Sequence, residues 1–153
     1  MKLITSNIIF QPDKQINKTP ASLGLQFEKV RFKTSDGLTL YGWHIPGPSK
    51  TTLVWFHGNA GNISDRVANI SEFQRNLGVN IFIFDYRGYG LSEGSPSEKG
   101  TYLDGDAAIK YITSHENTDP SRLVFFGRSL GCAVAAEMAI RHDVYALVLE
   151  SGF

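Results

Sequence analysis

A glycine-x-serine-x-glycine motif gives the clearest chemical signal in this sequence. It reads Gly127-Arg128-Ser129-Leu130-Gly131 and lies between an apolar run ending at Phe126 and a helical pattern beginning near Leu130. A sharp strand-to-helix turn strains such a serine and exposes its hydroxyl, and the two glycines, Gly127 and Gly131, avoid side-chain collisions. The helix N-terminus behind it offers free N–H groups where an oxyanion would form. Ser129 is therefore our candidate nucleophile, and the alternative is an ordinary turn with small residues for close packing.

A second copy of this motif meets the spacing but lacks the context. Gly90-Leu91-Ser92-Glu93-Gly94 lies in a loop, five residues beyond a strand end expected at Asp85. It runs into Ser95-Pro96 and opens no helix. We therefore expect that Ser92 is not a nucleophile.

Small residues also follow the apolar run that ends at Phe56. The segment His57-Gly58-Asn59-Ala60-Gly61-Asn62 allows a backbone N–H to approach a reacting carbonyl. Such an N–H and that of Leu130 would form an oxyanion hole. The alternative is a loop that leads into a helix capped by Asn62 or Ser64, and one loop can do both.

The third cluster, Asp85-Tyr86-Arg87-Gly88-Tyr89-Gly90, also follows a strand. We favour a structural role, in which an aspartate–arginine pair and glycine turns shape the loop beside the site. In the alternative, Tyr86 or Tyr89 lines a substrate pocket.

The spacing of apolar residues indicates the elements that position these groups. Short apolar runs are typical of strands buried on both faces, and segments with apolar residues three and four apart are typical of helices. Asp36-Gly37 marks the turn of an earlier hairpin. The order predicts an α/β fold, in which a hairpin precedes a mostly parallel sheet with helices on both faces. We expect the hairpin over 28–44, strands at 53–56, 79–84, 123–126 and 146–149, and helices over 63–77, 97–114 and 130–141. The apolar stripe of the first of these helices runs from Ile63 to Leu77.

The length of 153 residues suits one domain, which we place at 25–153 after an irregular lead-in at 1–24. Fifteen basic residues balance fifteen acidic ones, which excludes binding to nucleic acid or a membrane surface through bulk positive charge. The single cysteine, Cys132, cannot form an internal disulfide or a multi-cysteine metal site.

No apolar run approaches the ~18 residues of a membrane-spanning helix. The stretch Leu3–Phe10 is too short and too polar for a signal peptide. We expect a soluble, cytoplasmic protein that binds no metal and no nucleic acid.

Taken together, the three motifs resemble the α/β-hydrolase superfamily, in its serine-hydrolase branch. The chain is most similar to the abhydrolase-domain subgroup with H-G-N-A-x-N, D-Y-R-G-Y-G-x-S and G-R-S-L-G, and the similarity runs from about Phe27 to Phe153. The resemblance implies hydrolysis of esters, thioesters or amides in small-molecule or acylated substrates, without a cofactor. It implies that Ser129 is the nucleophile and that the backbone N–H groups of Asn59 and Leu130 bind the oxyanion, with Gly58 as a motif glycine. Some members of this subgroup are membrane-anchored, and nothing in this sequence indicates such an anchor.

The acid and the histidine of a serine triad have no usual place in this sequence. In this family they follow the nucleophile, and only 24 residues come after Ser129. His142 should lie about 20 Å away along a helix that rises 1.5 Å per residue. His115 and His44 belong to other parts of the sheet, and His57 fits a loop-shaping hydrogen bond better than a general base.

We therefore expect the N-terminal portion of a hydrolase domain, inactive by itself. The alternative is a non-catalytic binding module, or an inactive gene fragment, that retains the fold. Glu150 would anchor a loop, and Cys132 would serve as a small packing residue.

Overall fold

The core of the molecule is a six-stranded, mostly parallel β-sheet. The computed structural model describes residues 8–152. The sheet order is β2-β3-β6-β4-β7-β8. Strands β6, β4, β7 and β8 are parallel to one another, whereas β3 of the antiparallel β2–β3 hairpin pairs with β6 in antiparallel fashion. The bounds are β2 Glu28–Lys33, β3 Thr39–Ile45, β4 Thr52–Phe56, β6 Asn80–Phe84, β7 Leu123–Arg128 and β8 Ala146–Glu150.

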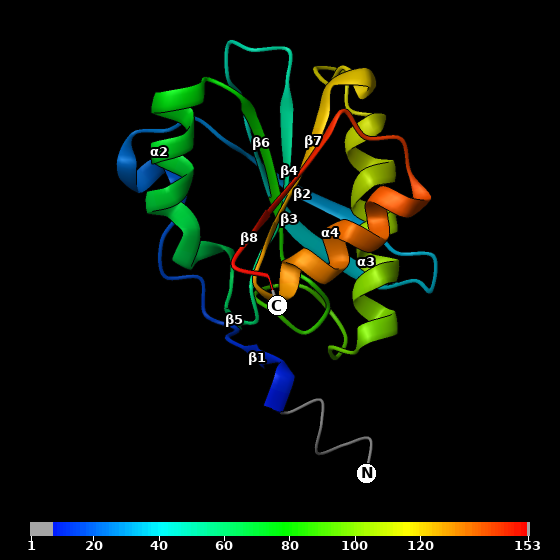
Figure 1. The fold of residues 1–153 in the computed structure, drawn as a ribbon. Helices are drawn as coiled ribbons and strands as arrows, with labels where there is room; N and C mark the ends of the chain where they lie inside the picture. Colours follow the sequence, from blue (N-terminus) through cyan, green and yellow to red (C-terminus); the bar gives the residue numbers. More distant parts are fainter. Residues whose placement is uncertain (1–7, 153) are drawn as a thin grey trace.

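Helices cover both faces of this sheet (Figure 1). Helix α2 (Val67–Leu77) packs on one face, and α3 (Glu98–Thr113) and α4 (Leu130–Arg141) pack on the other. The strands supply alternate residues to the two sides, because successive side chains of a strand point to opposite faces. Val54 and Phe82 belong to the apolar cluster beneath α3 and α4, and Trp55 and Ile83 belong to the one beneath α2.

The chain reverses its direction of travel across the sheet at β4. It leaves β4 through α2 to reach β6 on one side, then crosses back through α3 to β7 on the other side of β4. The loops after the neighbouring strands β4 and β7 therefore lead from their carboxyl ends to helices on opposite faces of the sheet. Open α/β sheets bind ligands at this kind of position.

The predicted elements agree with the structure at most boundaries. Helix α4 has the expected bounds, and α3 begins after Ser97, whose hydroxyl accepts a hydrogen bond from the N–H of Gly100. The helix expected over 63–77 starts as a 3-10 turn at Ile63–Arg66, and Gly78 caps its end at φ 61°. The prediction that Leu77 lies on the buried stripe is wrong, because the side chain of this last helical residue is 60% exposed.

Residues 8–24 are less irregular than expected. Strand β1 (Gln11–Pro12) pairs with β5 (Ala60–Gly61) in parallel, and a 3-10 helix spans Pro20–Leu23. The ring of Phe10 is buried in the core. A two-residue strand carries no period that a sequence can reveal. Most of the stretch Leu3–Phe10, considered above as a leader, lies outside the described residues.

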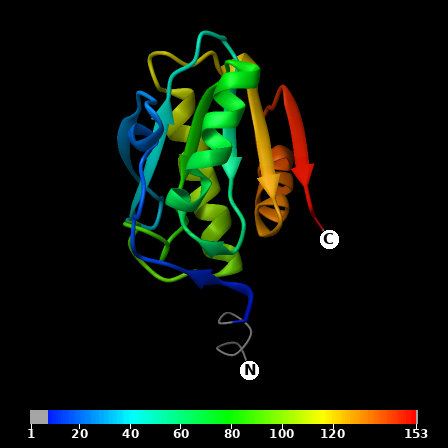
Figure 2. The ribbon, with the colours of Figure 1, turned by 90° about the vertical axis from the view of Figure 1, so that its left-hand side faces the viewer.

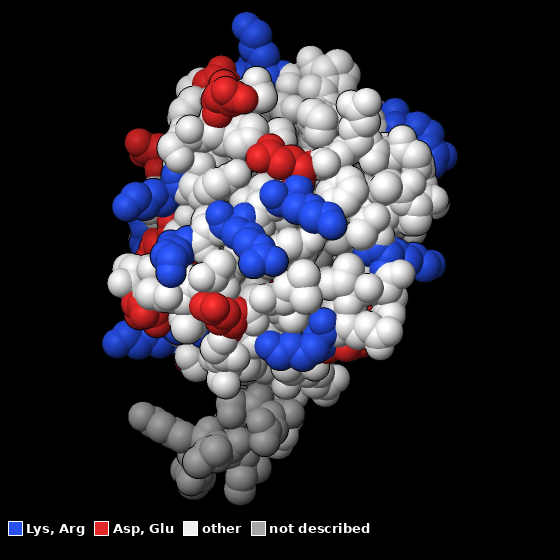
Figure 3. Space-filling view, turned by 180° about the vertical axis from the view of Figure 1, so that it is seen from behind, with Lys and Arg blue, Asp and Glu red and all other residues white. Residues whose placement is uncertain are grey.

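The two edges of the sheet differ in chemistry. At the β2 edge, Lys29, Arg31 and Lys33 are exposed. Figure 3 shows the molecule from behind the view of Figure 1, with basic and acidic side chains interspersed. Strand β8 forms the other margin, and its Leu147, Val148 and Leu149 are 39%, 46% and 49% exposed (Figure 2). Charged side chains protect an edge strand from pairing with other chains, so only the β8 edge is open to association.

Candidate active site

Ser129 occupies the turn between β7 and α4 in a strained backbone conformation. Its φ is 52° and its ψ −119°, a region that costs a residue with a side chain about 1–3 kcal/mol. A Cβ at Gly131 would lie 1.9 Å from the carbonyl oxygen of Phe56, and one at Gly127 would lie 2.6 Å from the carbonyl oxygen of Gly131. The close approach of three backbone segments therefore requires glycine at both motif positions.

The backbone of the last strand holds this turn in place. The N–H of Ser129 donates to the carbonyl oxygen of Glu150 at 2.9 Å. The carboxylate of Glu150 lies 3.5 Å from Arg128 in an exposed ion pair, which contributes little to stability. The main-chain contact agrees with the anchoring role expected for Glu150.

Ser129 is half-buried beside a small apolar hollow. Leu130 is the first residue of α4, so its N–H has no acceptor within the helix. Cys132 is buried, and its thiol donates to the carbonyl oxygen of Gly127 at 3.2 Å, as suits a packing residue. The hollow is lined by Ser129, Cys132, Ala133, Ala136, Leu149 and Gly152.

The loop that follows β4 lies directly beside Ser129. Strand β4 pairs with β7 so that Phe56 is opposite Gly127. A Cβ at Gly58 would lie 3.6 Å from the Cβ of Ser129. The fold therefore brings the segment 57–62 to the serine. Asn62 caps the following turn by accepting from the N–H of Ser64 at 2.8 Å, so the loop does lead into a helix as the alternative reading proposed.

His57 shapes this loop through both of its ring nitrogens. The ring is fully buried, and Nδ1 donates to the carbonyl oxygen of Gly58 at 2.7 Å. Nε2 lies 3.2 Å from Oδ1 of Asp85. In a planar trans peptide the carbonyl and the N–H point in opposite directions, so this contact directs the N–H of Asn59 away from the imidazole. His57 is thus engaged within the loop, as the hydrogen-bond hypothesis predicted.

Asp85 completes a buried pair with His57. Its Oδ1 also accepts from the N–H of Ile63 at 2.9 Å, and burial raises the pKa of its carboxyl group. Gly90 leaves the space for this carboxylate, because a Cβ there would lie 2.1 Å from Oδ2. The pair links the loop after β4 to the end of β6.

Two tyrosines hold the same loop from the other side. The hydroxyl of Tyr86 donates to the carbonyl oxygen of His57 at 3.0 Å, and that of Tyr89 donates to the carbonyl oxygen of Asn59 at 2.7 Å. Burial raises the pKa of Tyr86 well above its usual value and that of Tyr89 to about 12, so both remain protonated donors. Both rings are fully buried, which favours the structural role over pocket lining.

The aspartate–arginine pair expected in this cluster has other partners. Arg87 lies 2.8 Å from Asp36 and 2.9 Å from Asp104, whereas Asp85 pairs with His57. Residues 85 and 87 follow the end of β6, and their side chains leave it toward different elements. Arg87 thereby ties the hairpin turn to α3.

Ser92 has a fully satisfied and buried hydroxyl group. It donates to the carbonyl oxygen of Asp85 at 2.7 Å and accepts from the N–H of Tyr41 at 2.9 Å. These bonds join the loop to β3. The geometry agrees with the expectation that Ser92 is structural.

The remaining histidines lie away from Ser129. His142 follows the last residue of α4 and contacts Asp106 at 2.7 Å. His44 lies in β3, and its ring packs against that of His115 with centroids 4.3 Å apart. Among the described histidines, His57 alone lies in the loop beside Ser129; its Nδ1 donates to the carbonyl oxygen of Gly58, and its Nε2 faces Asp85 without a hydrogen bond.

Sequence reasoning missed two parts of this arrangement. Asp85 and His57 directly follow two different strands, and no local pattern in the sequence shows that these strands are neighbours. The contact of the Ser129 N–H with Glu150 is between main-chain atoms and leaves no trace in residue types. The only signal in the sequence was that His57 and Asp85 each come directly after an apolar run.

A sequence profile of the alpha/beta hydrolase fold family matches residues 51–152. The chain belongs to this family. The alpha/beta hydrolase domain-containing protein WAV2 of Arabidopsis thaliana is 38% identical, over 99% of this chain and 51% of that protein. Protein bem46 of Schizosaccharomyces pombe is 36% identical over 88% of this chain and 47% of its own length.

Solved structures of the family also superpose on this chain. An esterase of Pyrococcus furiosus, Pf2001, matches with a TM-score of 0.80 at 26% identity, over 94% of this chain and 57% of that one. The chain therefore spans about half the length of the curated relatives it matches. Within residues 8–152, no helix has both the length and the apolar character needed to cross a membrane. A Saccharomyces cerevisiae relative, 41% identical, is named an uncharacterized membrane protein.

Proposed function

We propose that this chain carries the nucleophile and the oxyanion hole of a serine hydrolase that cleaves ester, thioester or amide bonds. The observation that carries the proposal is the conformation of Ser129, at φ 52° between a strand and a helix, with glycines required on both sides. A residue is kept in such a strained turn where the surrounding backbone fixes it, and such strain clusters at functional sites.

The oxyanion would be bound by the N–H groups of Leu130 and Asn59. The first is unpaired within α4, and the second is directed by the contact of His57 with Gly58. Each donor of this kind lowers the barrier by about 3–4 kcal/mol. The tyrosine and aspartate contacts described above make the loop rigid, and a preformed donor needs no reorganisation during the reaction.

In the reaction, the Ser129 oxygen attacks the carbonyl carbon while a base removes the hydroxyl proton. The leaving group departs with a proton, and water then releases the acyl group. The base and its orienting acid would come from outside these 153 residues, because the described histidines have other positions and partners. The chain as given would then be one part of a catalytic unit, and neither a cofactor nor a metal takes part in these steps.

The surroundings of Leu130 support an apolar group on the substrate. A second hollow, of about 320 Å³, lies on the other side of the first turn of α4 and shares Ala133 with the one beside Ser129. Its lining is mostly apolar and includes Phe10, Tyr102 and Val134. An acyl chain would gain about 25 cal/mol per Å² of apolar surface that it buries there.

The cytoplasmic location inferred from composition stays a prediction.

A fluorophosphonate probe tests the nucleophile directly. Joined to the residues that complete the domain in its longer relatives, this chain should be labelled, and peptide mapping should place the adduct on Ser129. Labelling should disappear in Ser129→Ala and persist in Ser92→Ala, a matched control from the second copy of the motif. An adduct on Ser92, or equal labelling of the Ser129→Ala protein, would contradict the proposal.

A further inference from the structure

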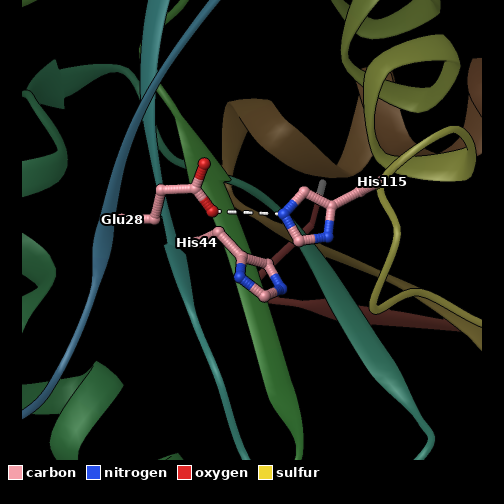
Figure 4. A group of neighbouring side chains, drawn as sticks. All are labelled: Glu28, His44 and His115. Carbon is pink, nitrogen blue, oxygen red and sulfur yellow. Dashed lines mark hydrogen bonds and ion pairs between the residues drawn. The ribbon is translucent and has the colours of Figure 1, made fainter.

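Two imidazoles and a carboxylate meet on the hairpin side of the sheet. Glu28 is the first residue of β2 and is the cross-strand partner of His44 in β3. His115 comes from the turn that follows α3 (Figure 4). One potential ligand atom from each residue lies within 4.8 Å of the other two. Residues 28, 44 and 115 are too far apart in the sequence to form a metal-binding motif, so only the fold brings this set together.

The three groups are already close to a coordination geometry. Nε2 of His115 lies 3.2 Å from Oε2 of Glu28, and the two imidazole rings have centroids 4.3 Å apart. An ion bound tetrahedrally at about 2.0–2.1 Å requires ligand atoms roughly 3.3 Å apart. The Glu28–His115 separation fits this value, and the ring of His44 would have to move closer by up to about 1.5 Å to complete the set.

His44 supplies the second observation that points to a ligand. The residue is only 3% exposed, and its Nε2 is buried without a hydrogen-bond partner among the described residues. An unsatisfied buried polar atom costs about 1–3 kcal/mol, so the position needs an explanation. A neutral imidazole has one ring nitrogen whose lone pair is available for a cation.

We propose that Glu28, His44 and His115 form a binding site for a divalent transition-metal ion of the zinc type. Two imidazole nitrogens and one carboxylate oxygen are a donor set that zinc prefers, and water would occupy the fourth position. Binding would replace the contact between His115 and Glu28 with bonds from both groups to the metal ion. The single cysteine predicted no multi-cysteine metal site, whereas this site takes its ligands from three separate elements of the fold.

The site is placed to stabilise the fold and not to act on the substrate of Ser129. His44 is opposite Phe82, toward the start of β6, whereas Ser129 follows the carboxyl end of β7. Bound metal would clamp the β2–β3 hairpin to the end of α3. The inference is therefore independent of the proposed hydrolysis, and either can fail alone.

Isothermal titration of the EDTA-treated 153-residue chain with zinc chloride tests the site. We expect one ion per chain and a higher melting temperature on binding. The variants His115→Ala and Glu28→Gln should lower the affinity at least ~10-fold. The side chain of Glu28 is 56% exposed, so the Glu28→Gln variant tests the site without replacing a buried ring. The site is at the opposite edge of the sheet from β8, so self-association through β8 does not cover the metal site.

His142→Ala is the matched control. His142 and Asp106 also form an imidazole–carboxylate pair, 2.7 Å apart, but with no second imidazole. The His142→Ala variant should bind zinc with the same affinity as the wild type. Absence of saturable binding, equal affinity in His115→Ala, or loss of binding in His142→Ala would overturn the proposal. Cobalt in place of zinc should give the intense visible absorption of a tetrahedral site, and the weak bands of six-coordinate cobalt would also count against it.

Discussion

At the scale of single residues, the glycines near Ser129 have different reasons for being glycine. Gly131 is required because a carbonyl oxygen from β4 occupies the space of a side chain. At Gly58 the nearest atom to a Cβ would be 3.5 Å away, an ordinary van der Waals distance. One motif glycine is thus fixed by packing and the other is free to accept a methyl group.

Replacing Gly131 with alanine should destabilise the protein strongly. The new methyl group would meet the backbone of Phe56 at 1.9 Å, and overpacking costs about 1–3 kcal/mol or more. Urea unfolding should show a much lower midpoint or no folded state. Gly58→Ala is the matched control and should shift the midpoint only slightly. Similar midpoints for the two variants would contradict the packing argument.

His44 should make the stability depend on pH. Its pKa is about 4 in the folded chain and about 6.5 in the unfolded chain, so below pH 6.5 the unfolded state binds a proton that the native state does not. This contribution to stability is complete above pH 6.5 and is lost progressively as the pH falls to about 4.

The melting temperature, measured in EDTA from pH 7 to 4, should therefore fall less steeply in His44→Phe than in the wild type. Other titrating groups affect both proteins in the same way. Parallel curves for the two proteins would show that His44 does not titrate differently on folding.

At the scale of elements, local sequence was enough to place most helices and strands, but not their partners. Helix α4 and the strand cores follow from apolar runs and spacing, which depend on neighbours in the chain. The contacts Asp85–His57 and His44–His115 depend on strand order, which apolar spacing does not encode. Leu77 continues the apolar spacing of α2 but is exposed, because the end of the helix extends beyond the part of the sheet that it covers.

Strand β8 is the element that should govern association. Its three apolar residues are 39–49% exposed, and it forms hydrogen bonds to β7 alone. The isolated chain should therefore self-associate through this edge. In light scattering, Val148→Lys should shift the population toward monomer, because a lysine opposes edge pairing.

The control for this prediction adds the same charge elsewhere. Gln26→Lys changes an exposed residue just before β2, at the opposite edge of the sheet from β8, and should associate like the wild type. A monodisperse wild-type monomer with a sharp cooperative melt would be inconsistent with an adhesive β8 edge.

At the scale of the whole molecule, the 153-residue chain should not hydrolyse esters by itself. Loss of the base in a serine enzyme costs on the order of a million-fold in turnover and leaves ~10³–10⁴ over water. His57, the histidine beside the site, is fully buried, with Nδ1 bonded to the carbonyl oxygen of Gly58 and Nε2 facing Asp85. Hydrolysis of a short-chain nitrophenyl ester by the wild type should equal that by Ser129→Ala and His57→Ala. Robust turnover that both substitutions abolish would identify His57 as a base.

The hydrogen bond from the Ser129 amide to Glu150 makes that amide a reporter on β8. An amide proton exchanges with solvent deuterium only when its bond opens, and edge elements open more readily than central ones. The Ser129 amide should therefore exchange at the rate at which β8 separates from β7, although the residue itself lies between central elements. Any partner that covers β8 should slow this exchange, and deuterium uptake at one peptide would then measure how firmly the serine is held.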